Sequence, residues 1–267
     1  MTTQLRRGQL RQHGESRLLW QKALRLASPF LLLLLWEAMS RFGLLDRRFF
    51  PPPSEVIWSA RSMVQDGSLA AAVLSSLRRL AIGYVSGALL GIAVGLWLGL
   101  SSWSRALFEP WLIVTYPVPK LAVYPLLVLI VGLGEAPIIL LLAIAIFYVV
   151  AINLIAGVLA IRPVILDVGR DCGASFLQLV RTVALPASMP HIFTGLEIAM
   201  GIAYIVLIAA EFVGAKSGLG SIIWSSWQLF DVAPMYVAIV TISVLGYVSV
   251  MLLRLAAGIM MPWRGQL

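Results

Sequence analysis

The chain has 267 residues, of which 60% are hydrophobic and only 12% are charged, and its mean hydropathy is +0.94. Soluble domains of this size are nearer half apolar and a quarter charged, so the composition predicts a protein embedded in a membrane. The net charge of +8 comes without a basic stripe interleaved with aromatic residues. This pattern argues against a nucleic-acid partner and is typical of basic loops on the cytoplasmic side of a lipid bilayer.

The N-terminal segment 1–25 is basic and holds Arg6, Arg7, Arg11, Arg17, Lys22 and Arg25. The apolar run that follows from Leu26 continues into Trp36 and Glu37 without the small-residue site that a cleaved signal peptide requires. We therefore expect a cytoplasmic basic segment followed by an uncleaved first helix.

Six segments have the roughly 20 mostly apolar residues that a membrane-spanning helix needs. They lie near residues 22–41, 80–100, 111–131, 137–159, 192–212 and 237–257. The predicted fold class is thus an all-α membrane protein with six transmembrane helices. Its parts are the basic segment 1–25, a transmembrane domain over 26–260 and a tail over 261–267.

Two local patterns stand out between and within these segments. The prolines from Pro51 to Pro53 predict an extended entry into a short interfacial helix, which Ser54 would cap and which would run to about Gln65. In the second span, glycines recur every fourth residue from Gly83 to Gly99, which places them on one face and predicts close packing against another helix.

The third segment is interrupted by Pro117, Pro119 and Pro125, with Lys120 among them. A broken helix is tolerated in a bilayer only where protein or a water-filled cavity satisfies its backbone, so this break predicts a translocation pathway. Two interpretations of Lys120 stay open: it attracts an anionic substrate, or it snorkels or pairs with Glu109 or Glu135 as a structural residue.

An even number of spans and the positive-inside rule place the N-terminus in the cytoplasm, together with segments 101–110, 160–191 and 258–267. The first external loop nevertheless carries several basic residues: Arg47, Arg48, Arg61, Arg78 and Arg79. The predicted location is the bacterial cytoplasmic (inner) membrane, which the chain crosses several times.

The loop over 163–186 combines a short amphipathic helix, Gly173, a second short helix and a proline-marked exit at Pro186 and Pro190. The spacing of Gly173, Val183, Leu185 and Pro186 resembles the EAA loop of binding-protein-dependent ABC importer permeases. Asp167-Val168-Gly169 replaces Glu-Ala-Ala at its opening, which keeps the acid and lowers helix propensity at Gly169 by roughly 1 kcal/mol.

Further motifs resemble the nitrate/sulfonate/taurine-type permeases within this family. They are Trp36-Glu37, Pro52-Pro53-Ser54-Glu55-Val56, Ser76-Leu77-Arg78-Arg79, Gly132-Leu133-Gly134-Glu135, Ala210-Glu211 and Ser217-Gly218-Leu219-Gly220. The resemblance implies a type I importer fold, a second copy of the permease, two cytoplasmic ATPase subunits that carry ATP and Mg²⁺, and an extracytoplasmic binding protein. It further implies a small anionic cargo such as a sulfonate, taurine or nitrate.

The resemblance assigns coupling to the ATPase to Asp167, Gly173, Ala174, Ser175, Phe176, Leu185 and Pro186. For the pathway or its gate, the polar residues of the spans are candidates because they are costly in lipid: Tyr116, Lys120, Tyr124, Asn153, Tyr204 and Glu211. Each tyrosine, and Asn153, can equally be a packing or interhelical hydrogen-bond residue. Glu211 is either an external gate or the partner of Lys216 in a helix-end salt bridge.

The sequence contains no Gly-x-x-x-x-Gly-Lys-Ser/Thr motif, so ATP hydrolysis is expected on a separate subunit. We expect no catalytic residues. Two alternatives compete with the permease: a secondary transporter driven by an ion gradient, which does not account for the 163–186 loop, and an integral-membrane enzyme, for which Asp167 and Asp171 form too small a set.

Overall fold

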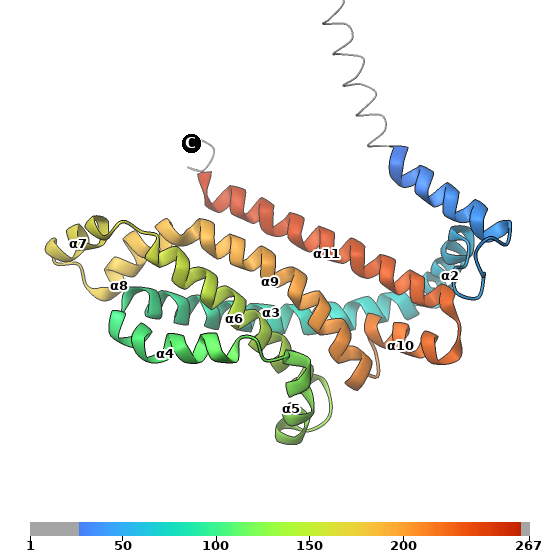
Figure 1. Ribbon diagram of the computed structural model, residues 1–267, viewed down its shortest axis with the longest axis horizontal. Coiled ribbons are helices and arrows are strands. Elements are labelled where there is room, and N and C mark those ends of the chain that lie inside the picture. The colour runs from blue at the N-terminus through green and yellow to red at the C-terminus, as the bar shows by residue number, and fades with distance from the viewer. Residues whose placement is uncertain (1–26, 263–267) are drawn as a thin grey trace, which may run out of the picture.

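A computed structural model describes residues 27–262, and these form an elongated bundle of helices (Figure 1). No strand occurs within this range. Residues 27–41 are helical, and the elements that follow are α2 (Pro53–Gln65), α3 (Ser68–Leu100), α4 (Ser102–Thr115), the 3₁₀ turn η1 (Lys120–Val123), α5 (Tyr124–Val131), α6 (Glu135–Leu159), α7 (Pro163–Asp171), α8 (Phe176–Leu179), the π-helical turn η2 (Val180–Ala184), α9 (Leu185–Gly214), α10 (Leu219–Leu229) and α11 (Val232–Met260).

Four of these stretches are long and apolar enough to cross a membrane: Ser68–Leu100, Glu135–Leu159, Phe176–Gly214 and Val232–Met260. The pair α4 and η1–α5 passes the same test only when its halves are taken together, and it bends by 93° where the prolines predicted a break; it counts as a fifth span if the two halves form one. The first predicted span begins in the undescribed part of the chain, so the count of six is not reached within 27–262. The basic segment 1–25 and the end of the tail, 263–267, also lie outside the described residues.

The second span is longer than predicted, because α3 begins at Ser68 and not near Leu80. Gly67, with φ of 77°, separates it from α2, and the Asp66 carboxylate accepts the N–H of Ser68. Hydrogen bonds from Ser68 hold the pKa of Asp66 below its usual range. Arg78 and Arg79 are therefore helical residues, which corrects their placement in an external loop.

The glycine seam predicted in the second span is confirmed and packs α3 against α6. A Cβ added at Gly83 would lie 2.6 Å from Leu142 Cβ, and one at Gly99 would lie 2.6 Å from Val158 Cβ. At Gly87 it would collide with the backbone of Ala143. The two helices thus approach at backbone distance from Gly83 to Gly99 of α3.

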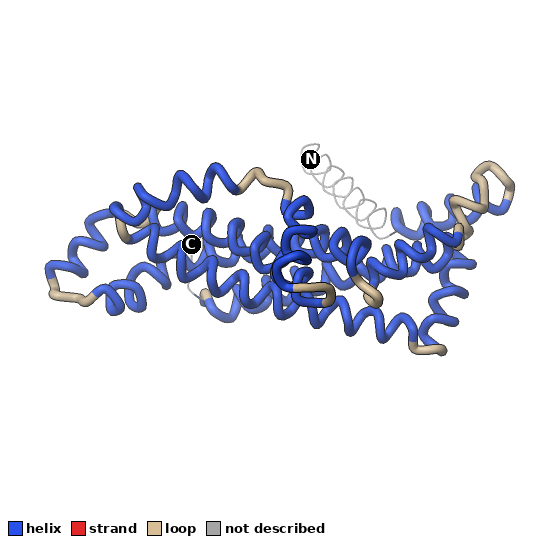
Figure 2. Tube along the Cα trace, turned by 90° about the horizontal axis from the view of Figure 1, so that it is seen from below, coloured by secondary structure: helices blue, strands red, loops and turns tan. Residues whose placement is uncertain are grey.

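Opposite ends of the bundle carry different connections (Figures 1 and 2). We call them the α7 end, with α7 and α8, and the α2 end, with α2 and α10. At the α2 end the prediction that Ser54 caps α2 is wrong, because Pro52 is the N-cap residue. The Ser54 side chain instead donates to Glu37 Oε1 at 2.8 Å. Glu37 also pairs with Arg41, so this carboxylate joins the helix over 27–41 to the start of α2.

The exit of the 163–186 loop differs from the prediction in that no proline ends it. The chain stays helical from Phe176 to Gly214, because the π-helical turn η2 carries α8 into α9. Pro186 lies in the first turn of α9, and Pro190 lies inside that helix. His191 is consequently a residue inside the helix, and its side chain packs beside Gly157 of α6.

The glycine seam predicts opposite effects for two glycine-to-alanine changes. Gly87→Ala should lower the free energy of unfolding by about 1–3 kcal/mol, because the added methyl group meets the Ala143 backbone, which cannot move aside cheaply. Gly201→Ala, also mid-helix, meets nothing within 4 Å and should raise stability by up to about 1 kcal/mol through helix propensity. Thermal unfolding of the two purified variants in detergent tests this; equal midpoints would contradict it.

Candidate functional site: the α7 end, the helix break and a buried ion pair

The α7 end has the helix–glycine–helix form that the sequence predicted. Gly173 ends α7 with φ of 76°, a conformation that residues with a Cβ rarely adopt. Ser175 then begins α8 with a capping box: its hydroxyl accepts the Gln178 N–H, and the Gln178 side chain accepts the Ser175 N–H at 2.7 Å. These local signals fold the loop into a compact projection.

This projection exposes an apolar surface, which we call the α7–α8 surface. It consists of Val164, Ile165, Val168, Phe176 and Leu177, each between 39% and 59% exposed. Asp167 stands among them and pairs with Arg170 at 3.1 Å. Exposed apolar side chains next to charged ones, on a helix that projects from the bundle, are typical of a protein-docking surface.

The residues assigned to coupling fall into two groups. Asp167 and the run Gly173, Ala174, Ser175 and Phe176 belong to the projecting loop, whereas Leu185 and Pro186 lie half-buried at the start of α9. Leu185 packs against a core cluster that includes Leu96 and Val158. Val180 packs there too, whereas Phe176 is 56% exposed.

Gly169 has a packing role that helix propensity did not reveal. A Cβ at this position would lie 2.8 Å from Leu179 Cδ1, so the glycine lets α7 lie directly against α8. The glycine that replaces the last alanine of Glu-Ala-Ala therefore leaves room for the Leu179 side chain between the two short helices.

Lys120 closes the break in the third span. Its Nζ donates to the carbonyls of Thr115 at 3.2 Å, Tyr116 at 2.7 Å and Val118 at 2.9 Å, which satisfies the open C-terminal end of α4. The ammonium also lies 4.5 Å from the centroid of the Tyr148 ring. Its partners are thus neither Glu109 nor Glu135; Glu109 pairs with Arg105, and Glu135 with Arg78 and Arg79.

The other pathway candidates do not gather in one place. Tyr116 is partly exposed beside Tyr148, and Tyr124 is buried where α5 meets Gly214. Asn153 donates to the Val149 carbonyl of its own helix, next to Gly195 of α9. Each of these contacts is a packing or intrahelical contact.

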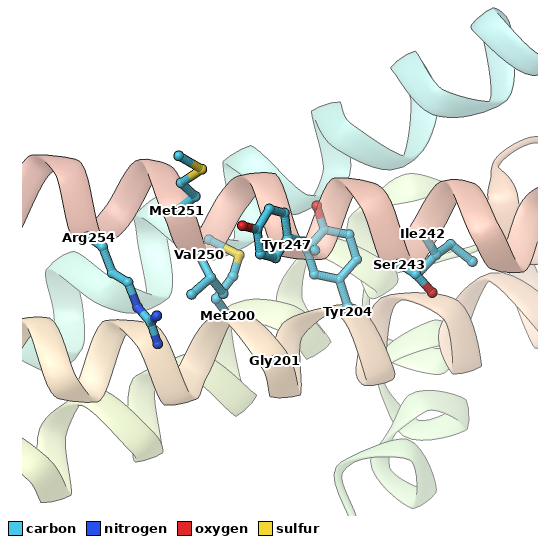
Figure 3. Close-up of a pocket in the computed structure, with 10 residues that line it drawn as sticks. Met200, Gly201, Tyr204, Ile242, Ser243, Tyr247, Val250, Met251 and Arg254 are labelled. Atoms are coloured by element: carbon cyan, nitrogen blue, oxygen red, sulfur yellow. The ribbon is translucent and has the colours of Figure 1, made fainter. Parts of the chain in front are cut away.

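Tyr204 lines a groove of about 540 Å³ between α9 and α11 (Figure 3). Its hydroxyl lies 2.9 Å from Ser249 Oγ of α11. Methionines Met200 and Met251 contribute apolar walls, and Arg254 lies at one end, paired with Glu197 at 3.0 Å. The groove thus combines an apolar lining with a few polar groups.

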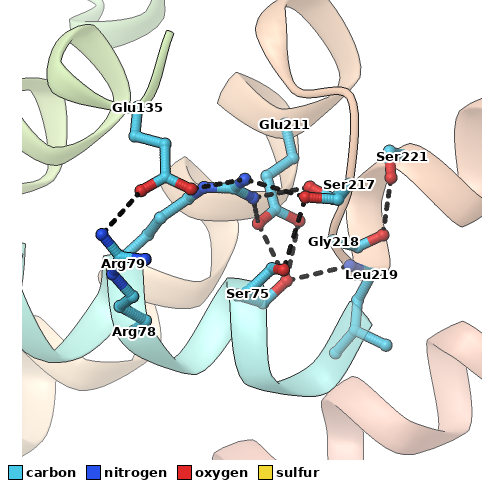
Figure 4. Close-up of polar contacts among 10 residues, drawn as sticks. Ser75, Arg78, Arg79, Glu135, Glu211, Ser217, Gly218, Leu219 and Ser221 are labelled. Carbon is cyan, nitrogen blue, oxygen red and sulfur yellow. Dashed lines mark hydrogen bonds and ion pairs between the residues drawn. The ribbon is translucent and has the colours of Figure 1, made fainter. Parts of the chain in front are cut away.

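Glu211 is fully buried at the α2 end, where it is the centre of a polar network (Figure 4). Its carboxylate accepts from Arg79 Nη1 at 2.8 Å, from Ser76 Oγ at 2.8 Å and from the Gly220 N–H at 2.8 Å. Arg79 donates further to the Ser217 carbonyl and to Glu135. The partner of Glu211 is therefore Arg79, which corrects the predicted salt bridge with Lys216.

We call this set the Arg79 cluster; it comprises Ser76, Arg79, Glu135, Glu211, Ser217 and Gly220. Sequence reasoning missed it because it treated Arg79 as a loop residue. The signal was present in the rule that a charge within a span needs a partner. With the second span drawn from Ser68, Arg79 is a cation within a helix and an obvious partner for Glu211.

Comparison with known proteins identifies the family. A profile described as the binding-protein-dependent transport system inner membrane component matches residues 87–257. The taurine transport system permease protein of Escherichia coli (strain K12) is 32% identical over 251 residues, which cover 92% of this chain and 91% of that protein. The chain belongs to the permease family of binding-protein-dependent ABC importers. It is the membrane-spanning permease component of such an importer. This membership favours the permease over the ion-gradient-driven transporter.

Further relatives and solved structures agree. A protein of Bacillus subtilis (strain 168) named for aliphatic sulfonates transport is 30% identical over 94% of this chain and 90% of its own length. The nitrate import permease protein of Synechococcus elongatus is 31% identical over 73% of this chain and 68% of its own length. A chain of the inward-facing MetNI methionine ABC transporter has a TM-score of 0.59 at 21% identity, covering 71% of this chain and 92% of that one. This last likeness confirms the type I importer fold.

The contacts of Lys120 predict that its role in this permease is structural. Lys120→Met should lower the free energy of unfolding by about 1–3 kcal/mol, because three carbonyls lose a charged donor. Lys216→Met makes the same chemical change at a lysine of the α9–α10 loop and should change stability by less than about 0.5 kcal/mol. Denaturation of both variants, followed by tryptophan fluorescence, measures the difference. An unchanged midpoint for Lys120→Met would overturn the structural role.

Proposed function

We propose that two copies of this permease form the translocation pathway of an importer for a small anion. Two cytoplasmic ATPase subunits, which bind ATP and Mg²⁺, dock on the α7–α8 surfaces, and an extracytoplasmic binding protein delivers the cargo. In this arrangement the N-terminus and the α7 end are cytoplasmic, and the α2 end faces the binding protein. The permease itself has no catalytic role, because hydrolysis takes place on the ATPase subunits.

The cargo proposal is supported by the relatives, which are named for taurine, aliphatic sulfonates and nitrate. All three carry a small anionic group, either a tetrahedral sulfonate or planar nitrate, and taurine carries an ammonium group as well. Arg47, Arg48 and Arg61 at the α2 end add cations to the side that would receive such a cargo.

The observation that carries the coupling proposal is the α7–α8 surface itself. Phe176 and Leu177 are 56% and 55% exposed although they lie between Ser175 and Gln178, the two residues of a well-formed capping box, so the loop holds apolar side chains out in a fixed geometry. Such side chains are suited to a pocket on another protein, in which aromatic anchors contribute most of the binding energy.

Asp167, Gly173, Ala174 and Ser175 would set the orientation of this surface. Leu185 and Pro186 would join it to α9, because both lie where the helix leaves the loop. Movement of a bound ATPase would then pass directly into α9. Coupling is thus proposed to be mechanical, through one continuous helix.

Transport should depend on ATP and on the binding protein, and not on an ion gradient. Vesicles that contain the permease with its ATPase and binding protein should take up radiolabelled taurine, an alkanesulfonate or nitrate when ATP is supplied. Ionophores that collapse proton and sodium gradients should leave the initial rate unchanged. Loss of uptake with the ionophores, at constant ATP, would contradict the proposal.

The docking role of the α7–α8 surface can be separated from other effects with two matched variants. Phe176→Ala should reduce copurification of the ATPase by about tenfold or more, since a buried aromatic anchor contributes about 2 kcal/mol or more to an interface. Phe230→Ala removes a more exposed ring, 80% against 56%, at the α2 end and should leave copurification unchanged. Equal copurification of both variants would remove the docking role from Phe176.

A further inference from the structure

The Arg79 cluster buries a full ion pair where apolar side chains would serve stability equally well. The side chains of Arg79 and Glu211 are 3% and 0% exposed, and they join α3 to the end of α9. Replacing a buried ion pair by well-packed apolar residues is often neutral or stabilising, so such a pair is weak evidence for a purely stabilising role. Its best-attested use is to specify one arrangement among several.

Arg79 has a second carboxylate within reach (Figure 4). Its Nη1 is 2.8 Å from Glu211, and its Nη2 is 3.3 Å from Glu135 at the start of α6. Glu135 is 39% exposed, and its other partner, Arg78, is a loose one at 3.6 Å. Arg79 can therefore release Glu211 and keep a carboxylate partner on α6.

Glu211 also keeps a partner if Arg79 is released. Its Oε2 accepts the Gly220 N–H in the first turn of α10, whose N-terminus favours a negative charge. Because the loop from α9 to α10 is short, residues 215–218, the carboxylate and this N–H belong to one connected unit. Separation of α3 from α9 thus leaves neither charge without a partner.

The two sides of the pair also belong to bodies that are held differently. Arg79 is on α3, which the glycine seam fixes to α6, the helix that carries Glu135. Glu211 is on α9, which continues through η2 to the α7–α8 surface as one helical stretch of 39 residues, about 58 Å long at 1.5 Å per residue. π-Helical turns such as η2 are frequent at functional sites.

We propose that Arg79 is a latch that holds the α9–α10 unit against α3 by bonding Glu211 and Glu135 together, and that it releases Glu211 and keeps Glu135 when α9 moves during transport. The proposal rests on the proposed function, since ATPase movement at the α7–α8 surface would drive α9. With both carboxylates bound to Arg79, the latch closes the α2 end; with Glu135 alone bound, α10 is free to move with α9.

A reversible cross-link tests whether the latch must open. Ser217 Oγ lies 3.3 Å from Ser75 Oγ, on the loop before α10 and on α3, and both side chains are accessible to an oxidant. Ser75→Cys with Ser217→Cys, in a Cys172→Ser background, should form a disulfide across the latch. The protein is the complete transporter in vesicles, and the probe is whichever of taurine, an alkanesulfonate and nitrate the unmodified transporter takes up fastest.

Oxidation should lower the initial uptake rate by about tenfold or more, and a reductant should restore it, because a bistable element fixed in one state blocks the cycle. Uptake that stays within about twofold of the reduced rate, with nearly all protein cross-linked, would overturn the latch. The pair Ser101→Cys with Ser104→Cys, whose hydroxyls lie 2.9 Å apart within one helix start, controls for oxidation itself. Absence of ATP-dependent uptake in the unmodified transporter would instead count against the proposed function.

A second variant tests the latch without a disulfide. Glu135→Gln weakens the bond that Arg79 keeps after it releases Glu211. It should lower the maximal uptake rate several-fold, while the thermal midpoint and ATPase copurification stay unchanged. Glu55→Gln is the matched control, because Glu55 is also a partly exposed carboxylate paired with an arginine, at 3.7 Å from Arg47. Full uptake by Glu135→Gln would contradict the role of Glu135 as the carboxylate that keeps Arg79 when Glu211 is released.

Discussion

The glycine seam between α3 and α6 is the constraint on which the rest of the bundle depends. In a bilayer, apolar side chains gain little from contact with each other over contact with lipid, so close backbone approach has to supply the van der Waals energy. Gly83, Gly87 and Gly99 supply it by removing the Cβ atoms that would keep the helices apart. The resulting pair is a rigid body against which α9 packs, and it fixes where Arg79 and Glu135 lie.

The second structural feature of consequence is the continuity of α8, η2 and α9. A proline in the first turn of a helix costs nothing, because that N–H has no intrahelical partner, but Pro186 and Pro190 would each remove a donor from an uninterrupted α-helix. The wider π-helical turn at Val180–Ala184 precedes both and leaves the path helical. One helical stretch therefore extends from an exposed surface at the α7 end to a buried carboxylate at the α2 end.

Much of the architecture could be predicted because membrane helices obey strong one-dimensional rules. The apolar runs located the long helices, the prolines located the break before α5, and the four-residue glycine period identified the packing face of α3. Boundaries were harder. The prediction placed the start of α3 near Leu80, although the helix begins at Ser68, because the serines, alanines and arginines of its first turns lower the hydropathy there. The same error kept Arg79 out of the candidate charges within the spans, so Lys216 was the one partner weighed for Glu211, beside its role as an external gate.

Contacts that depend on tertiary geometry could not be predicted from the residues alone. Lys120 and Glu211 are each a single charge in an apolar sequence, yet their structural solutions differ. Lys120 finds backbone carbonyls within five residues of itself, released by the helix break, so its charge is satisfied locally. Glu211 finds its cation 132 positions away in the chain, on a helix that the sequence does not mark as its neighbour.

This contrast explains why the two charges are suited to different roles. The hydrogen-bond partners of Lys120 all belong to one short segment, so no relative movement of long helices can separate them without unfolding that segment. The partners of Glu211 belong to α3 and α10, and those of Arg79 to α6, α9 and the loop before α10. A charge shared among elements that can shift relative to one another has a free energy that depends on helix positions. Its hydrogen bonds can therefore distinguish two arrangements of the bundle, which a local cap such as Lys120 cannot do.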